Sequence, residues 1–91
     1  MIVYISIGNS DDKLTQEQWY DYIIEVIRTV SVGHIHGAWY SEPASKYQNA
    51  CWCVEFKTSN DVYQAKEALK IIRGNYRQDS IAWAVAETEF I

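Results

Sequence analysis

Two short segments each carry a pair of potential metal ligands or catalytic groups spaced two residues apart. One contains His34 and His36, and the other contains Cys51 and Cys53. Because side chains alternate across a β-strand, each pair shares one face if its segment is a strand. If His34 pairs with Glu55, the same register places His36 opposite Cys53. The imidazole, thiol and carboxylate groups then form a candidate zinc set, or a Cys–His nucleophilic site.

A structural interpretation of the same residues competes with the chemical one. A slip of one residue separates the histidines from the cysteines, and no Cys-x-x-Cys spacing supports a metal site. Buried cysteine commonly serves as a small apolar filler. We therefore expect no cofactor and no metal, and we keep His34, His36 and Cys53 as the alternative ligand set. A disulfide between Cys51 and Cys53 is not expected from one strand.

Most of the other residues that could bind a ligand lie in three polar segments, 8–14, 41–49 and 74–80. Long polar loops on a rigid scaffold commonly carry binding residues. The candidate ligand- or partner-binding residues are seven from these segments and two tyrosines from the expected strands: Asn9, Ser10, Asp11, Asp12, Lys46, Tyr47, Arg77, Tyr4 and Tyr40.

Two kinds of ion are conceivable at these segments. Arg77 and Lys46 form a candidate anion site together with the free N–H groups at the start of a helix. Asp11 and Asp12 oppose an anion there, and they form a candidate site for a divalent cation. Adjacent aspartates are commoner as turn and cap residues, so the sequence favours a structural role for them.

The composition favours a folded domain and limits its partners. The chain has 91 residues, of which 48% are hydrophobic and 14% aromatic. A net charge of −4 argues against a nucleic-acid binder. No apolar run approaches the roughly 18 residues of a membrane span, and no signal peptide is evident. We therefore expect a cytoplasmic protein, with neither nucleic acid nor a membrane as its partner.

The first helix is expected over residues 16–32. Thr15 and Gln18 have the spacing of a capping box, and Gly33 is expected to end the helix in a left-handed conformation. Its apolar side chains recur every three or four residues and define the expected buried stripe: Trp19, Ile23, Val26, Ile27 and Val30.

The second helix is expected to begin at Asn60 or Asp61 and to close at Gly74. Its apolar stripe is shorter and consists of Val62, Ala65, Leu69 and Ile72. Four other segments have the residue types and alternation of β-strands: 2–7, 35–40, 50–57 and 81–90.

The resulting order, β-α-β-β-α-β, resembles the ferredoxin-like split βαβ architecture over the whole chain. This resemblance implies a single α+β domain over 1–91. It implies a four-stranded antiparallel sheet of order 4-1-3-2 with two helices on one face. The connections at 8–14, 41–49 and 74–80 then meet at one end. The resemblance rests on topology and implies a fold, not an activity.

The alternation divides the strand residues into two faces. The set expected to face the helices is Val3, Ile5, Ile7, Ile35, Trp39, Trp52, Val54, Phe56, Ile81, Trp83 and Val85. The set expected on the open face is Tyr4, Ser6, His36, Ala38, Tyr40, Cys51, Cys53, Glu55, Ala82, Ala84 and Ala86.

The last strand is apolar on both faces, and a strand of this kind is usually buried on both faces. A second copy of the chain is the simplest cover for the open face, and we expect a homodimer. Sheet-to-sheet pairing of this kind resembles the dimeric α+β barrel proteins, which have a similar topology.

Two functional hypotheses follow from the sequence. The first is a small non-catalytic binding module that captures a protein or a small molecule; an inhibitor from a mobile element is one version of it. The alternative is a cofactor-independent enzyme resembling dimeric α+β barrel proteins. In that alternative, His36, Tyr4 or Tyr40 would transfer protons in a pocket between helices and sheet.

Overall fold

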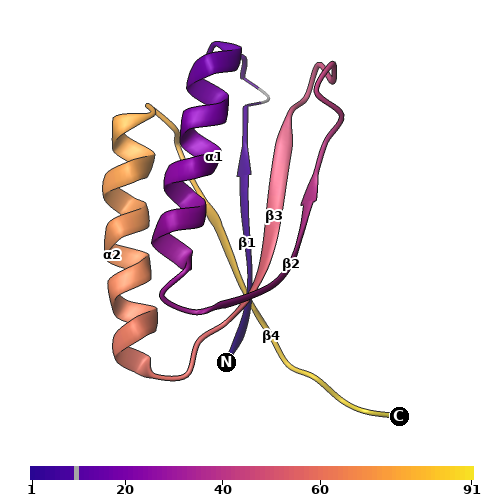
Figure 1. Cartoon of the computed structure of the whole chain (residues 1–91), viewed down its shortest axis with the longest axis vertical. Coiled ribbons are helices and arrows are strands. Elements are labelled where there is room, and N and C mark those ends of the chain that lie inside the picture. The colour runs from indigo at the N-terminus through magenta and orange to yellow at the C-terminus, as the bar shows by residue number, and fades with distance from the viewer. Residues whose placement is uncertain (10) are drawn as a thin grey trace.

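The computed structural model describes residues 1–9 and 11–91, and its elements follow the order β-α-β-β-α-β. Their bounds are β1 (Ile2–Gly8), α1 (Gln16–Val30), β2 (His34–Tyr40), β3 (Asn49–Glu55), α2 (Ser59–Asn75) and β4 (Ala82–Ala86). The strands form one antiparallel sheet in the order β2-β3-β1-β4, and both helices cover the same face of it (Figure 1). The predicted ferredoxin-like α+β fold and its 4-1-3-2 strand order are confirmed.

Helix α1 begins at the predicted capping box. The Gln18 N–H donates to Thr15 Oγ1 at 3.2 Å, and the Thr15 N–H donates to Gln18 Oε1 at 3.0 Å. Four side chains of the helix are buried: Trp19, Tyr22, Val26 and Val30. The predicted stripe omitted Tyr22, which is fully buried and stacks on Tyr76 with ring centres 4.8 Å apart.

Helix α2 begins at Ser59, one to two residues earlier than predicted. Thr58 is its N-cap, and the Asp61 N–H donates to Thr58 Oγ1 at 3.1 Å. Gly74 lies inside the last turn and does not close the helix. The buried stripe of Ala65, Leu69 and Ile72 is as predicted.

The core lies between the two helices and the covered face of the sheet. β1 and β3 supply alternate side chains to it, because Val3 pairs with Val54 and Ile5 pairs with Trp52. All four of these side chains are buried. Burial of a large apolar side chain stabilises the fold by roughly 1.5–3 kcal/mol, so the two central strands anchor the domain.

Gly33 joins α1 to β2 at a point of close approach. A Cβ on this residue would lie 2.7 Å from the Glu55 carbonyl oxygen and 2.8 Å from Val54 Cγ1. The prediction of a left-handed helix end was wrong, because no glycine in the described residues has a positive φ and Ser31 is the C-cap. Lack of space, not backbone conformation, requires glycine here.

Strand β2 contains a bulge that reverses its alternation. His34 pairs with Glu55 and Ile35 with Val54, as one register predicts, but the next pair is Gly37 with Cys53. His36 is therefore the extra residue of a β-bulge. From there on every side chain of the strand changes face, so Trp39 lies on the open face opposite Cys51. The predicted faces of Ala38, Trp39 and Tyr40 were wrong for this reason.

Replacing Gly33 with alanine tests this close approach. Gly33→Ala is expected to lower the free energy of unfolding by about 1–3 kcal/mol, because the added methyl group collides with β3. Gly74→Ala is the matched control: a Cβ there meets nothing within 4 Å, and the helical residue gains roughly 0.5–1 kcal/mol. Urea unfolding followed by circular dichroism measures both, and a Gly33→Ala protein as stable as wild type would contradict the packing described.

Removal of the Tyr22 hydroxyl tests the packing of α1. The hydroxyl has no hydrogen-bond partner among the described residues, so Tyr22→Phe is expected to raise the free energy of unfolding by about 1 kcal/mol. Burial raises the pKa of Tyr22 to about 12. The wild-type protein therefore loses stability as the pH rises from the ordinary tyrosine pKa towards this value, and the variant loses less.

Tyr63→Phe is the control for this substitution, because Tyr63 is exposed on α2. It is expected to change stability negligibly at any pH. Equal behaviour of the two variants in urea unfolding at neutral and alkaline pH would show that the Tyr22 hydroxyl is satisfied.

Candidate functional site

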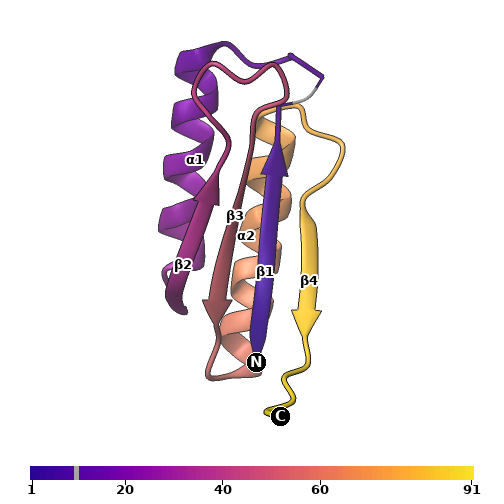
Figure 2. The ribbon, with the colours of Figure 1, turned by 90° about the vertical axis from the view of Figure 1, so that its right-hand side faces the viewer.

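The three loops that were predicted to meet do so at one end of the sheet (Figure 2). The Asn9 N–H donates to the Gln48 carbonyl oxygen at 2.8 Å, which joins the first loop to the second. Lys13 Nζ donates to the Arg77 carbonyl oxygen at 3.2 Å, and Arg77 Nη2 donates to the Lys13 carbonyl oxygen at 3.1 Å. These reciprocal contacts join the first loop to the third.

Asn9 holds the first loop together and is almost fully buried, with 2% of its surface exposed. Its Oδ1 accepts from the Leu14 N–H at 3.0 Å, and its Nδ2 donates to the Leu14 carbonyl oxygen at 3.1 Å. Its Nδ2 also lies 3.4 Å from Gln48 Oε1. The polar groups of the Asn9 side chain are therefore all hydrogen-bonded within the protein.

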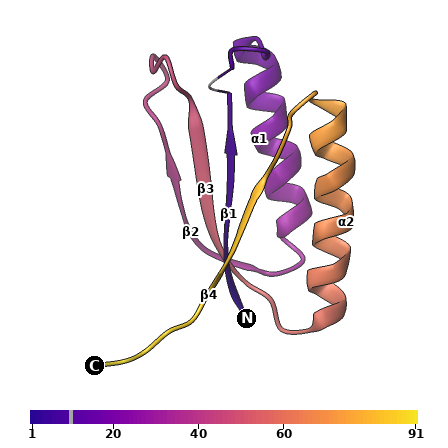
Figure 3. The ribbon, with the colours of Figure 1, turned by 180° about the vertical axis from the view of Figure 1, so that it is seen from behind.

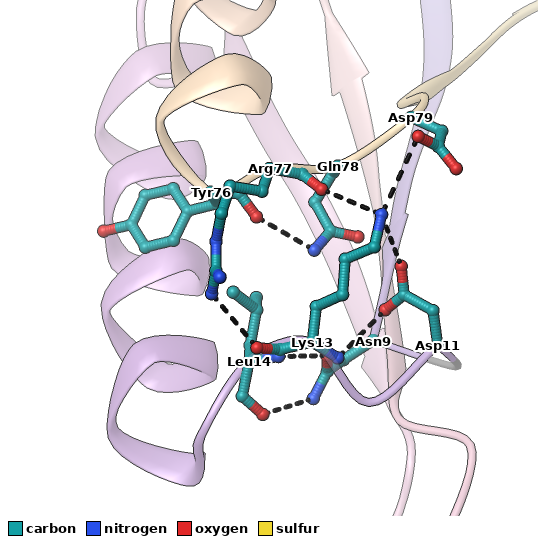
Figure 4. Close-up of polar contacts among 8 residues, drawn as sticks. All are labelled: Asn9, Asp11, Lys13, Leu14, Tyr76, Arg77, Gln78 and Asp79. Atoms are coloured by element: carbon teal, nitrogen blue, oxygen red, sulfur yellow. Dashed lines mark hydrogen bonds and ion pairs between the residues drawn. The ribbon is translucent and has the colours of Figure 1, made fainter.

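Lys13 lies at the centre of the polar contacts at this end (Figure 4). Its Nζ is 3.3 Å from Asp11 Oδ2 and 3.8 Å from Asp79 Oδ1. A hydrogen bond from the Lys13 backbone N–H is the main reason that the pKa of Asp11 lies below its usual value. The sequence prediction omitted Lys13, although a lysine directly after two aspartates in a turn is the signal that would have indicated it.

The remaining predicted loop residues occupy turn positions or make local contacts. Asp12 and Arg77 adopt positive φ angles of 57° and 56°, which suits turn positions. Lys46 lies 5.6 Å from the Tyr47 ring centre, whereas the Arg77 side chain donates to the first loop. Ser10 lies outside the described residues. The Arg77 side chain is therefore engaged with the first loop, and an anion site that it shares with Lys46 stays a prediction.

The predicted histidine–cysteine set is divided by the β-bulge. His36 Nε2 lies 2.8 Å from Glu55 Oε1, and the His34 and His36 rings are 4.6 Å apart. Cys53 lies opposite Gly37 instead of His36. Within residues 1–9 and 11–91, no three His, Cys, Asp or Glu side chains lie close enough together to hold a metal ion.

The open face of the sheet carries a shallow apolar hollow. It measures about 170 Å³ and is lined by Tyr4, Gly37, Ala38, Trp39, Cys51 and Cys53. Trp39 and Tyr4 are large side chains that stay 57% and 45% exposed. Both cysteines are free thiols, and a hydrogen bond with Cys53 raises the pKa of Tyr4 above its usual value.

Of the predicted tyrosines, only Tyr4 belongs to this hollow. Tyr40 lies opposite Ala50 on the covered face, and its hydroxyl accepts from Trp52 Nε1 at 3.0 Å. Trp39 was missed as a site residue because strict alternation places it in the core. Gly37 was the available signal, since glycine inside a strand commonly marks a bulge.

The segment after β4 extends beyond the sheet on the side away from the helices (Figures 1 and 3). Residues 87–91 belong to no helix or strand, and all five are exposed. Phe90 keeps 94% of its surface accessible. Its neighbour Ile91 is fully exposed as well.

A comparison of the chain with models of known protein families and a second comparison with curated proteins both find no match. Neither helix, within the residues that the structure describes, has the length and apolar character that a bilayer crossing requires.

The contact between His36 and Glu55 at the bulge can be tested by titration. A hydrogen bond from His36 is the main reason that the pKa of Glu55 lies below its usual value. His36→Ala is therefore expected to raise the Glu55 pKa towards that value, as measured by a carboxyl-detected NMR titration. A lowered carboxylate pKa stabilises the fold above the unfolded-state pKa, and this contribution is lost as the pH falls through the folded-state value.

His34→Ala is the matched control for this titration. His34 influences Glu55 only through charge, as the smallest of the contributions to its pKa. The Glu55 pKa should therefore rise much less in His34→Ala than in His36→Ala. Equal shifts in the two variants would contradict the specific hydrogen bond.

Proposed function

We propose that the chain is a small non-catalytic binding module that captures protein surfaces through the open face of its sheet. The observation that carries this proposal is the apolar hollow with Trp39 and Tyr4 at its rim. Aromatic side chains that are large and rigid supply most of the binding energy in protein interfaces. The hollow is too shallow and open to enclose a small molecule, whereas a protein surface can cover it.

The partner that fits this face best is a second copy of the chain. β4 presents Ala82 and Ala84 on the open face beside Tyr4, because Ala84 pairs with Tyr4 and Ala82 with Ser6. Such small side chains let another sheet approach closely. A face shared by two copies is self-complementary, as a two-fold dimer requires. The two free thiols agree with a cytoplasmic location, where thiols stay reduced.

The alternative of a cofactor-independent enzyme gains less support from the geometry. Its three candidate proton-transferring residues do not share a site. Tyr40 lies on the covered face, His36 bonds to Glu55, and Tyr4 lines the hollow on the open face. A tyrosine hydroxyl is protonated at neutral pH in any case, and the hydrogen bond with Cys53 moves the pKa of Tyr4 further upward, which does not suit a general base.

Replacing Trp39 tests the proposal. Sedimentation velocity over a range of concentrations is expected to show a wild-type dimer. Trp39→Ala is expected to raise the dissociation constant about 30-fold, the effect of losing roughly 2 kcal/mol at an aromatic anchor. Circular dichroism checks that the variant stays folded, since Trp39 lies on an edge strand and is half exposed.

Tyr63→Ala is the control, because Tyr63 is an equally exposed aromatic residue on α2, away from the open face. It should leave the dissociation constant unchanged. A wild-type chain that stays monomeric, or a dimer that tolerates Trp39→Ala, would contradict the proposed use of the open face.

A further inference from the structure

A basic groove lies between α2 and the edge strand β4, on a different surface from the open face. It measures about 140 Å³ and is lined by Lys66, Leu69, Lys70, Arg73, Ile81 and Trp83. Three of the chain's eight Lys and Arg residues therefore meet over an apolar floor, although the chain as a whole carries a net charge of −4. Such a concentration of charge in an acidic protein favours an acidic ligand.

The acidic side chains near the groove neutralise only part of its positive charge. Lys70 Nζ pairs with Glu67 Oε1 at 2.9 Å, whereas the described residues offer no ion pair to Lys66 or Arg73. Lys66 Nζ lies 5.1 Å from the Trp83 ring centre. The Trp83 Nε1 donor is buried and has no hydrogen-bond partner in the described chain. Lys66 and Arg73 are therefore the two cations available for carboxylates.

The segment after β4 has the complementary character. Glu87 and Glu89 carry negative charge, and Phe90 and Ile91 are large apolar residues. The segment leaves β4 on the side opposite the helices, so it points away from the groove of its own chain (Figures 1 and 3). Its acidic and apolar side chains match the basic rim and the apolar floor of that groove.

We propose that residues 87–91 of one copy dock in the α2–β4 groove of a second copy. Glu87 and Glu89 pair there with the basic side chains of α2, and Phe90 packs on the apolar floor. Five extended residues span about 16 Å, and the groove opens at an edge of the sheet, where an extended segment reaches it directly. The inference rests on the self-association proposed above, but it uses a different surface from the open face.

Reciprocal charge reversal tests the docking in the 91-residue chain. Glu87→Lys combined with Glu89→Lys reverses the segment, and Lys66→Glu combined with Lys70→Glu reverses the groove. Each double variant is expected to weaken self-association about tenfold in sedimentation velocity, as opposite charges become like charges. An equimolar mixture of the two is expected to recover wild-type association, because both contacts of the mixed dimer are again complementary.

Two charge reversals elsewhere on the surface serve as controls. Glu42→Lys and Lys57→Glu alter exposed residues outside the segment and the groove, and they should leave the dissociation constant unchanged. The Trp83 indole N–H signal in NMR spectra supplies an independent readout. It is expected to shift with protein concentration in the wild type and to stay constant in Glu87→Lys/Glu89→Lys.

The outcomes separate this inference from the proposed function. If Trp39→Ala abolishes association while the reversals have no effect, docking of the segment is overturned and open-face pairing stands. If the reversals weaken association, the mixture restores it and Trp39→Ala has no effect, docking stands and open-face pairing is overturned. A Trp83 signal that responds to the segment variant but not to concentration would indicate docking within one chain and overturn the second copy as the occupant.

Discussion

Alternation of buried and exposed side chains along β1 and β3 constrains the whole domain. These central strands contribute Val3, Ile5, Trp52 and Val54 to one face, where the two helices exclude water from them. The same alternation places Tyr4, Cys51 and Cys53 on the other face, which no element of the described chain covers. The packed core and the proposed recognition surface thus lie on opposite sides of one sheet, and a change in register would exchange the side chains of the two faces.

The helix positions and most of the buried stripes could be predicted because they depend on periodicity, which a single sequence records. The strand order followed from the resemblance of the element order to the ferredoxin-like architecture. The bulge at His36 could not be predicted in this way, since alternation assumes one residue for each step along the strand. That single extra residue moved Trp39 to the surface and Tyr40 to the covered side. It also separated His36 from Cys53, so the predicted ligand set failed for a backbone reason and not a chemical one.

The loop residues show a different limit of sequence interpretation. Asn9, Asp11 and Arg77 have the residue types of a binding site, but Asn9 and Asp11 bond mainly within their own loop, and Arg77 bonds to the first loop. Loop ends must satisfy many backbone and side-chain groups, and polar residues are the means of doing so. Residue type alone therefore does not separate a loop that binds a ligand from a loop that binds its neighbour. The two kinds of loop differ in the hydrogen-bond partner of each polar atom, which depends on the three-dimensional arrangement of the loops.

The bulge in β2 has a consequence for how the sheet behaves towards other strands. β2 and β4 are the two edges of the sheet, and an edge strand offers unpaired backbone groups to any strand that approaches. The bulge interrupts the regular spacing of those groups along β2, so an incoming strand cannot form a continuous ladder there. β4 has no such interruption, but with five residues it offers only a short one. Both edge strands therefore disfavour the repeated strand addition that builds fibres, although the open face of the same sheet exposes apolar side chains.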